Sequence, residues 1–426
     1  MPAAGSSAFG LPGTPFSSPG GFSWRLEQTR NGSIYYFVVH DDDHLTPSPT
    51  FGGWYALTAD FGSGSVPSFS SAVHLANTDS DHNLEVAFFM ADTNGLLWNA
   101  TSGDSDISVV GPVLRAWDAL SGTQIFSFGC SAPTNSTVYG LTTFEDTAIP
   151  YVASLIHDNA ATPDVFYLNV NNAATGALVA ALAMPSATRV MPYVLSDGIG
   201  YIYACGYSFS ADEYNISSAY IAKISLLSGS IVATLPLTVG GTGPNGMIMN
   251  RSNGQILLDF TNGSFSGTGD IRTIDSINLI ELGTYSGLCA SFMRTQLLIP
   301  NWFNEIHFPL THHDAVTGPA VDCPRGEFTV ASPKSGSTGN ITRIGLQNAV
   351  PLVLIVDTVA GAQFGTQNNA WGYPFNYMTW NPFIEGFIGC TGIASNNIGA
   401  AMTYDPYTTG SCGANPCTGA DLVEFR

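Results

Sequence analysis

The chain has 426 residues, of which 45% are hydrophobic and only 10% are charged, and its formal net charge is −20. A charge of this sign excludes nucleic acid and anionic lipid as partners, because both are themselves negative. No apolar run is long enough to span a bilayer, since the longest, Ala349 to Val356, has the length of a strand. We therefore expect no nucleic-acid binding, no membrane span and a mostly neutral polar surface.

The N-terminal segment differs from the rest of the chain. Residues 1–21 are rich in Pro, Gly and Ser and follow no strand or helix pattern. They predict a leader or docking arm, followed by a single folded domain over residues 22–426. The first seven residues form neither the basic nor the apolar part of a signal peptide. We expect either that a signal sequence has been removed or that export takes another route.

One phrase recurs along the remaining chain: a strand, a turn of small residues that ends in Gly, and a second apolar strand. Its copies begin at Trp54, Leu114, Phe166, Tyr220, Ile277, Ile341 and Ala401. The turns end at residues 64, 122, 176, 229, 287, 348 and 410, so successive gaps are 58, 54, 53, 58, 61 and 62 residues. In the sixth copy Asn348 replaces Gly, and Asn tolerates the left-handed conformation well. This period predicts a repeat architecture.

Two further strands precede each copy of the phrase. In the fourth unit they are Val190–Leu195 and Tyr201–Cys205, and in the fifth they are Met247–Asn250 and Gln255–Phe260. Four short antiparallel strands in each unit of roughly 55 residues predict one propeller blade. The sequence therefore predicts an all-β fold, a seven-bladed β-propeller of four-stranded antiparallel blades. The sequence leaves open whether the ring closes by face packing, by a disulfide or by exchange of a late strand.

The turn phrase resembles the repeats of the quinoprotein-dehydrogenase-like and YVTN-type propeller superfamily. Ala116-Trp-Asp-Ala-Leu-Ser-Gly-Thr123 is the most similar copy. The resemblance implies the propeller fold. Quinone enzymes of that superfamily have a tryptophan late in each repeat, where this chain has Phe126, Val179, Val232 and Ala290. We therefore transfer the fold without any catalytic residue, and we expect no cofactor.

The densest ionisable cluster is His40-Asp41-Asp42-Asp43-His44, which follows the strand predicted over Ile34–Val39. Its carboxylates could bind Ca²⁺, and its two imidazoles could bind a transition metal. The alternative is a solvated, charged loop between strands. Asp79-Ser-Asp-His82 is a weaker version of the same pattern.

A second group, His312, His313 and Asp314, lies in a long connection between Pro309 and Pro319. Propellers commonly bind ligands at the mouth of the central channel, so we expect this group there if the chain binds a ligand. A His–Asp pair could also serve as a general base. The aromatic run Trp371–Trp380 predicts either a surface on which sugars stack or the innermost strand of the last blade.

The seven cysteines form no zinc-binding pattern. Cys412 and Cys417 bracket a Gly-Ala-Asn-Pro turn, which predicts a local disulfide in an oxidising compartment. The pairing of Cys130, Cys205, Cys289, Cys323 and Cys390 is open. N-glycosylation sequons occur at Asn31, Asn99, Asn135, Asn215, Asn250, Asn262 and Asn340.

No hydrolase elbow, phosphate-binding loop or zinc-protease motif occurs in the sequence. Together these features favour a secreted, glycosylated, non-catalytic structural or recognition module at the cell surface or outside the cell. Its expected partners are another extracellular protein, copies of itself in a filament or surface layer, or glycans. The alternative is an extracellular carbohydrate-active lyase or hydrolase, or a degenerate quinoprotein-like enzyme, with its site at the channel mouth.

Overall fold

The computed structural model of the chain describes most of its centre and separate strands toward both ends. The described residues are 21–28, 34–41, 53–60, 68–69, 73–77, 87–91, 95–101, 111–133, 136–144, 149–158, 160–210, 216–240, 242–250, 254–262, 269–289, 327–334, 338–347, 350–360, 377–381, 386–391, 400–404 and 423–424. These segments form strands and turns without any helix. They accordingly include no helix with the length and hydropathy that crossing a membrane requires.

Each sheet is built from strands that are consecutive in the chain and pair antiparallel. The first contains β1 (Gly21–Gln28), β2 (Ile34–Asp41), β3 (Gly53–Asp60), β4 (Ser68–Phe69) and β5 (Val73–Asn77). The second contains β6 (Ala87–Ala91), β7 (Leu96–Thr101), β8 (Val113–Asp118) and β9 (Thr123–Gly129). The third contains β10 (Ser136–Phe144), β11 (Tyr151–Asp158), β12 (Val165–Asn172) and β13 (Leu178–Ala183). Gly21, the last residue of the predicted leader, is the first residue of β1, and residues 1–20 lie outside the described residues.

The remaining sheets follow the same plan. The fourth contains β14 (Arg189–Ser196), β15 (Tyr201–Phe209), β16 (Ile216–Ser225) and β17 (Ser230–Leu237). The fifth contains β18 (Thr242–Asn250), β19 (Gln255–Asn262), β20 (Gly269–Asp275) and β21 (Ile280–Cys289). In the sixth, the described strands are β22 (Glu327–Lys334), β23 (Thr338–Gln347) and β24 (Val350–Ala360). The seventh contains β25 (Tyr377–Asn381), β26 (Gly386–Thr391), β27 (Ala400–Tyr404) and β28 (Val423–Glu424).

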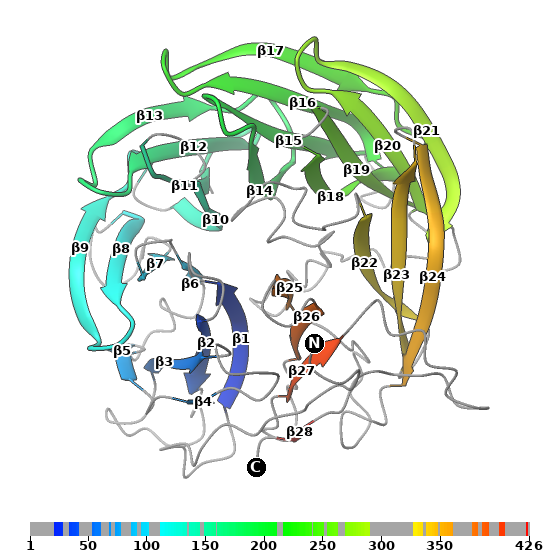
Figure 1. Ribbon diagram of the computed structural model, residues 1–426. Helices are drawn as coiled ribbons and strands as arrows, with labels where there is room; N and C mark the ends of the chain where they lie inside the picture. The colour runs from blue at the N-terminus through cyan, green and yellow to red at the C-terminus, as the bar shows by residue number, and fades with distance from the viewer. Residues whose placement is uncertain are drawn as a thin grey trace.

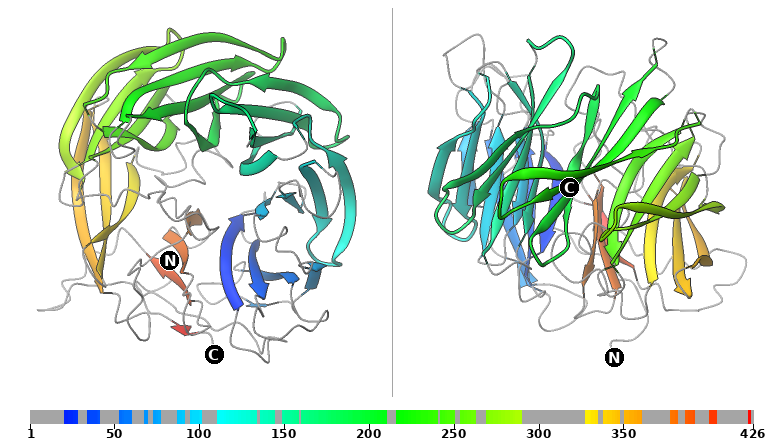
Figure 2. Two further views of the ribbon diagram at one scale, coloured as in Figure 1. Left: turned by 180° about the vertical axis from the view of Figure 1, so that it is seen from behind. Right: turned by 90° about the horizontal axis from the view of Figure 1, so that it is seen from above.

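The sheets stand around a common axis (Figure 1), with the first strand of most sheets nearest the centre and the last strand at the circumference. Figure 2 shows the same ring from behind and from its side. Neighbouring sheets touch through β1 and β6, β6 and β10, β10 and β14, and β14 and β18. The first and last sheets touch through β1, β25 and β26. These two sheets therefore meet by packing, without exchanging a strand among those described.

The core lies between successive sheets. Its largest fully buried side chains are Trp98, Phe144, Phe166, Tyr203 and Phe260, which come from four sheets. Strands buried on both faces are rich in apolar residues, as β11 and β15 show. The outer strands alternate instead: in β17, exposed residues alternate with less exposed ones along most of the strand. This pattern is typical of a strand with one face toward solvent.

The fifth repeat differs from the sequence prediction. We expected its third strand to begin at Ile277 and its turn to end at Gly287, but the third strand is β20 and the turn spans residues 276–279. Gly287 lies within β21. The misleading feature was the absence of a glycine in the true turn, where Leu279 adopts φ +54°. The corrected turn residues 122, 176, 229 and 279 are 54, 53 and 50 residues apart.

Candidate functional site

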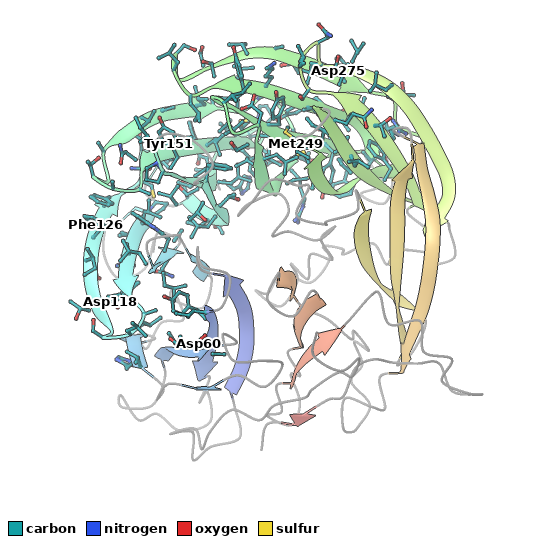
Figure 3. All side chains as sticks on the ribbon, in the orientation of Figure 1. Asp60, Asp118, Phe126, Tyr151, Met249 and Asp275 are labelled. Atoms are coloured by element: carbon teal, nitrogen blue, oxygen red, sulfur yellow. The ribbon has the colours of Figure 1, made fainter. Side chains whose placement is uncertain are left out.

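The third-to-fourth strand turns of the second to fifth sheets begin in a common way. Each opens with a residue whose side chain can accept a hydrogen bond from a backbone N–H two or three residues later, as in Asx and Ser/Thr turns. The acceptors, donors and distances are Asp118 and Leu120 at 2.9 Å, Asn172 and Ala174 at 2.8 Å, Ser225 and Ser228 at 3.3 Å, and Asp275 and Ile277 at 2.9 Å. Figure 3 labels Asp118 and Asp275 at the circumference of the ring.

Each of these turns ends with a residue in the left-handed region. The residues are Gly122 (φ +71°), Gly176 (φ +72°), Gly229 (φ +59°) and Leu279 (φ +54°). The glycine turns lie against the preceding sheet: a Cβ on Gly122 would lie 2.6 Å from the carbonyl oxygen of His74, and one on Gly229 would lie 3.3 Å from that of Val179. Here glycine is required both for its conformation and for the close approach of the two sheets.

The fifth turn is held against the fourth sheet by polar side chains. Lys223 of β16 donates from Nζ to the carbonyl oxygens of Ser276 at 3.0 Å and Ile277 at 3.1 Å. The Tyr203 hydroxyl donates to the same Ser276 oxygen at 3.1 Å. The Lys223 ammonium also lies 4.4 Å from the centroid of the Tyr201 ring, a cation–π contact. One of the chain's two lysines is thus used to join two sheets.

A β-bulge follows each of the four turns at the same place. The extra residue of each bulge is apolar and exposed, and it lies three residues after the end of the turn. These residues are Ile125, Val179, Val232 and Leu282. Bulges re-aim side chains and disturb the ladder at a sheet edge, which discourages edge-to-edge pairing. The outer strands therefore display apolar side chains without offering a regular edge.

Exposed apolar side chains gather at one end of the ring. Strand direction alternates within each sheet, so the first-to-second and third-to-fourth turns leave from the same end, which we call the turn end. Among the described residues, all eleven large exposed hydrophobic side chains lie in these turns or within three residues of one. They are Leu120, Ile125, Ile149, Leu178, Val179, Ile199, Leu227, Val232, Ile277, Ile280 and Leu282. Exposed apolar side chains therefore recur at the turn end of successive described sheets.

The opposite end, where the chain passes from one sheet to the next, carries a His–Asp pair. His157 at the end of β11 lies 3.1 Å from Asp164 (Nε2 to Oδ1), and its ring centroid is 4.6 Å from that of Phe166. The two side chains are 16% and 39% exposed. A carboxylate at one imidazole nitrogen fixes the orientation of the ring. Chemically, this pair could act as a general base toward a ligand bound at this end.

The predicted cluster at His40 belongs to the same structural position as His157. Strand β2 ends in His40-Asp41 and β11 ends in His157-Asp158, while His40 pairs with Trp54 and His157 with Phe166 in the ladders. The strand thus extends two residues beyond the predicted Val39. This equivalence was missed in the sequence, although two strands of equal length with the same last two residues were a visible signal.

Several predicted sites lie outside the described residues. These are Asp42, Asp43, His44, Asp79, His82, His312, His313, Asp314, Cys412 and Cys417, together with the sequons at Asn31, Asn135 and Asn215. Within the described part of the chain, no three His, Cys, Asp or Glu side chains are placed to share a metal ion. Of the aromatic run, Tyr377–Trp380 lies in β25, the first strand of its sheet.

One sequon lies where a glycan does not fit. Asn99 lies in β7, paired with Phe89 and Arg115 on either side, and only 3% of it is exposed. A buried strand position cannot accommodate a glycan, which needs a surface site. Asn250, Asn262 and Asn340 lie in β18, β19 and β23.

The two cysteines with described side chains are free thiols. Burial raises the pKa of Cys130 to about 11, and its Sγ lies 4.0 Å from Ser154 Oγ. Cys205 is fully buried in β15, and burial raises the pKa of its thiol as well. Burial therefore disfavours the thiolate, the reactive form of cysteine, at both positions.

No protein-family model matches the chain, and no curated protein sequence matches it either. Similar solved structures include the Dos1 propeller, at 9% identity and a TM-score of 0.49 over 92% of this chain and 94% of that one. Kuenenia stuttgartiensis hydrazine synthase has 9% identity and a TM-score of 0.48 over 89% of this chain and 95% of that one. Chaetomium thermophilum Raptor has 12% identity and a TM-score of 0.48 over 94% of this chain and 28% of that one.

Likenesses of this degree say nothing about function. The arrangement of the sheets defines the class of the protein: it is a β-propeller, as the turn phrase predicted.

Proposed function

We propose that this chain is a seven-bladed β-propeller that acts outside the cell as a non-catalytic structural or recognition module. One observation carries the proposal: the exposed apolar side chains recur at equivalent positions of four consecutive sheets and lie at the turn end. Side chains that repeat in this way form a contact surface, whereas a catalytic site needs different groups converging on one point. Many polar groups between the sheets are already used for packing, as Lys223 and Tyr203 illustrate.

Secretion and glycosylation are part of the proposal. The sequons other than Asn99 are Asn31, Asn135, Asn215, Asn250, Asn262 and Asn340. The low lysine content and the local Cys412–Cys417 spacing also support an oxidising, extracellular setting. The partner is another extracellular protein or further copies of the chain, with residues 1–21 as a docking arm, and glycans are a further ligand class.

The test begins with the protein purified from the medium of a eukaryotic host. We expect a density map to show seven blades, and we expect digestion with an N-glycosidase to lower the mass. Deleting residues 1–20, which leaves β1 intact, should weaken self-association if the arm docks on a neighbouring copy. Protein retained inside the cell without glycans, or a ring with another number of blades, would contradict the respective parts.

Metal binding by the His40–His44 cluster is a subsidiary proposal: Asp41, Asp42 and Asp43 would bind Ca²⁺, and His40 and His44 a transition metal. Asp41 ends β2 and pairs with Gly53 at the start of β3, which places it at the end of the ring opposite the turn end. Carboxylates grouped beyond such a strand end suit Ca²⁺. Isothermal titration with Ca²⁺ and Zn²⁺ should give heat that the Asp41→Asn/Asp43→Asn variant lacks.

A second function, hydrolysis or cleavage of an extracellular polysaccharide, is favoured by the His157–Asp164 pair alone. If that pair is a general base, Asp164→Asn should lower kcat on the responsive substrate at least tenfold without changing the melting temperature. His312, His313 and Asp314 would then be the next residues to substitute. Absence of turnover by the wild-type protein on a broad polysaccharide panel would eliminate this function.

A further inference from the structure

The three most exposed apolar side chains of the described residues come from three different turns. They are Leu227 (98% exposed), Ile199 (85%) and Ile277 (74%). The backbone N–H of Leu226 donates to the Gly200 carbonyl oxygen at 2.9 Å, which joins the turns of Leu227 and Ile199. Lys223 Nζ donates to the Ile277 carbonyl oxygen at 3.1 Å, which joins the third turn to the same corner of the fourth sheet. We call Ile199, Leu227 and Ile277 the turn-end patch.

Two fixed carboxylates flank the turn-end patch. Asp197 Oδ1 accepts hydrogen bonds from the backbone N–H groups of Ile199 at 2.9 Å and Tyr201 at 2.9 Å. Asp275 Oδ1 accepts one from Ile277 at 2.9 Å. Each carboxylate therefore lies two residues before a member of the patch and is oriented by that residue's own backbone. Both also raise the pKa of the Tyr203 phenol, after the larger effect of burial.

We propose that the turn-end patch binds an apolar, positively charged segment of another protein. The inference rests on the proposed recognition function and names the chemistry of its partner. Apolar side chains this exposed release water when a partner covers them. The two carboxylates outnumber the single Lys223 ammonium at this corner, so they favour Lys or Arg beside the apolar contacts. The overall charge of −20 accelerates encounter with a basic partner. A second copy is disfavoured, because it brings 32 acidic and only 12 basic residues.

The position of the turn-end patch in the ring distinguishes it from the equivalent turns. Leu120 occupies in the second sheet the place that Leu227 and Ile277 occupy in the fourth and fifth, two residues after the start of the turn. Only Leu227 and Ile277, however, are brought to one corner with Ile199. Leu120 therefore supplies a matched control, an exposed leucine in the same kind of turn without the other two members.

The test measures binding of two fluorescent synthetic peptides of equal length to the full chain by anisotropy. One peptide alternates Leu and Lys, and the other alternates Leu and Glu. We expect the Leu/Lys peptide to bind, and the Leu227→Ser/Ile277→Ser variant to bind it at least tenfold more weakly, although its net charge is unchanged. Leu120→Ser should bind as the wild type does. Asp197→Asn/Asp275→Asn should weaken binding and reduce its dependence on salt, because the charges are lost. The turns of this variant should remain folded, since Asn172 shows that an amide can accept the same kind of hydrogen bond.

Three outcomes would overturn the proposal. Equal binding of the Leu/Lys peptide by the wild type and by Leu227→Ser/Ile277→Ser would show non-specific attraction to the acidic chain. Equal binding of the Leu/Glu peptide would remove the role of charge. Binding of a peptide of residues 1–21, with none of the Leu/Lys peptide, would make the patch a self-assembly site. In each case the melting temperatures of the variants must match that of the wild type. The recognition function is tested independently, by secretion and assembly.

Discussion

The glycine turns and the fifth turn attach neighbouring sheets in two different ways. At Gly122 the absence of a side chain lets the turn approach the backbone of the first sheet. At Leu279 a side chain is present in the same left-handed conformation, and Lys223 and Tyr203 hold the turn by its carbonyl groups. In both cases the third-to-fourth strand turn packs against the preceding sheet. Either the close approach of a glycine or hydrogen bonds from polar side chains can hold it there.

Leu279 also shows why a strained residue is retained. It is 6% exposed and belongs to the main apolar cluster between the sheets. A left-handed conformation costs an L-residue about 1–2 kcal/mol. Burying a leucine side chain contributes about 2–3 kcal/mol, which offsets that cost. The glycines of the other turns avoid the cost but contribute no apolar surface.

The largest effect is expected where close approach is required. Gly122→Ala should lower the free energy of unfolding by about 2–4 kcal/mol, because Ala is strained at this φ and its Cβ meets backbone as well as side-chain atoms. Urea denaturation measures the change. Gly129→Ala, at the end of β9 with nothing within 4 Å of the added Cβ, is the control and should stay within about 0.5 kcal/mol of the wild type. Equal effects of the two substitutions would refute the close approach.

Removing the polar anchor comes next. Lys223→Met should lower the free energy of unfolding by about 1–3 kcal/mol, because the Ile277 carbonyl oxygen loses its ammonium donor. Tyr203→Phe removes the other donor to Ser276. A double-mutant cycle of the two substitutions should reveal coupling of at least about 0.5 kcal/mol, as expected for groups in one hydrogen-bond network. Strict additivity would mean that Lys223 and Tyr203 act independently of each other.

A smaller difference isolates the strain at Leu279. Both Leu279→Ala and Leu279→Gly lose the buried side chain, but only Gly relieves the left-handed conformation. We expect the Gly variant to be the more stable of the two by about 1 kcal/mol. The same pair at Leu257, a fully buried residue within β19, should give the opposite order. An Ala variant more stable than Gly at both positions would argue against the left-handed turn.

The smallest effect concerns pH. Hydrogen bonds from Asn278 and the backbone of Ile277 lower the pKa of Asp275 below its ordinary value of 3.8. A carboxyl whose pKa is lower in the folded state stabilises the fold above the unfolded-state pKa, and this stabilisation disappears as the pH falls through the folded-state pKa. Asp275→Ala should therefore lower the free energy of unfolding by about 1 kcal/mol or less at pH 7, and by less in acid.

The control for this pH dependence is built into the third sheet. Asn172 opens its turn with the same kind of hydrogen bond, to Ala174 at 2.8 Å, but cannot ionise. Asn172→Ala should destabilise the fold by an amount that does not change between pH 7 and acid. Urea denaturation at both pH values measures the two variants, and a pH-dependent effect at Asn172 would show that the Asp275 carboxyl is not the cause.

The repeat could be predicted because its signal is local. A capping side chain, small residues and a glycine lie within six positions, as in Asp118 to Thr123, and this chemistry sets the turn without help from the rest of the molecule. The sequence places the end of the fifth turn at Gly287, eight positions too late, because a local signal of this kind is missing at Leu279. Nothing in the local sequence shows that Leu279 can occupy a glycine's conformation, because the compensation comes from its burial between two sheets.

The candidate sites show the same division. The clusters at His40 and His312 were visible as runs of ionisable residues, whereas the pairing of His157 in β11 with Asp164, in the connection before β12, depends on how that connection folds back. The turn-end patch gives no sequence signal, since Ile199, Leu227 and Ile277 are single apolar residues in three separate turns. The sequence by itself determined the all-β repeat and its turns, because hydrogen bonds between near neighbours specify them. Only the tertiary structure decided which turns meet at one corner, that the sequon at Asn99 is buried and that Leu279 replaces glycine. These features depend on contacts between sheets that are distant in the chain.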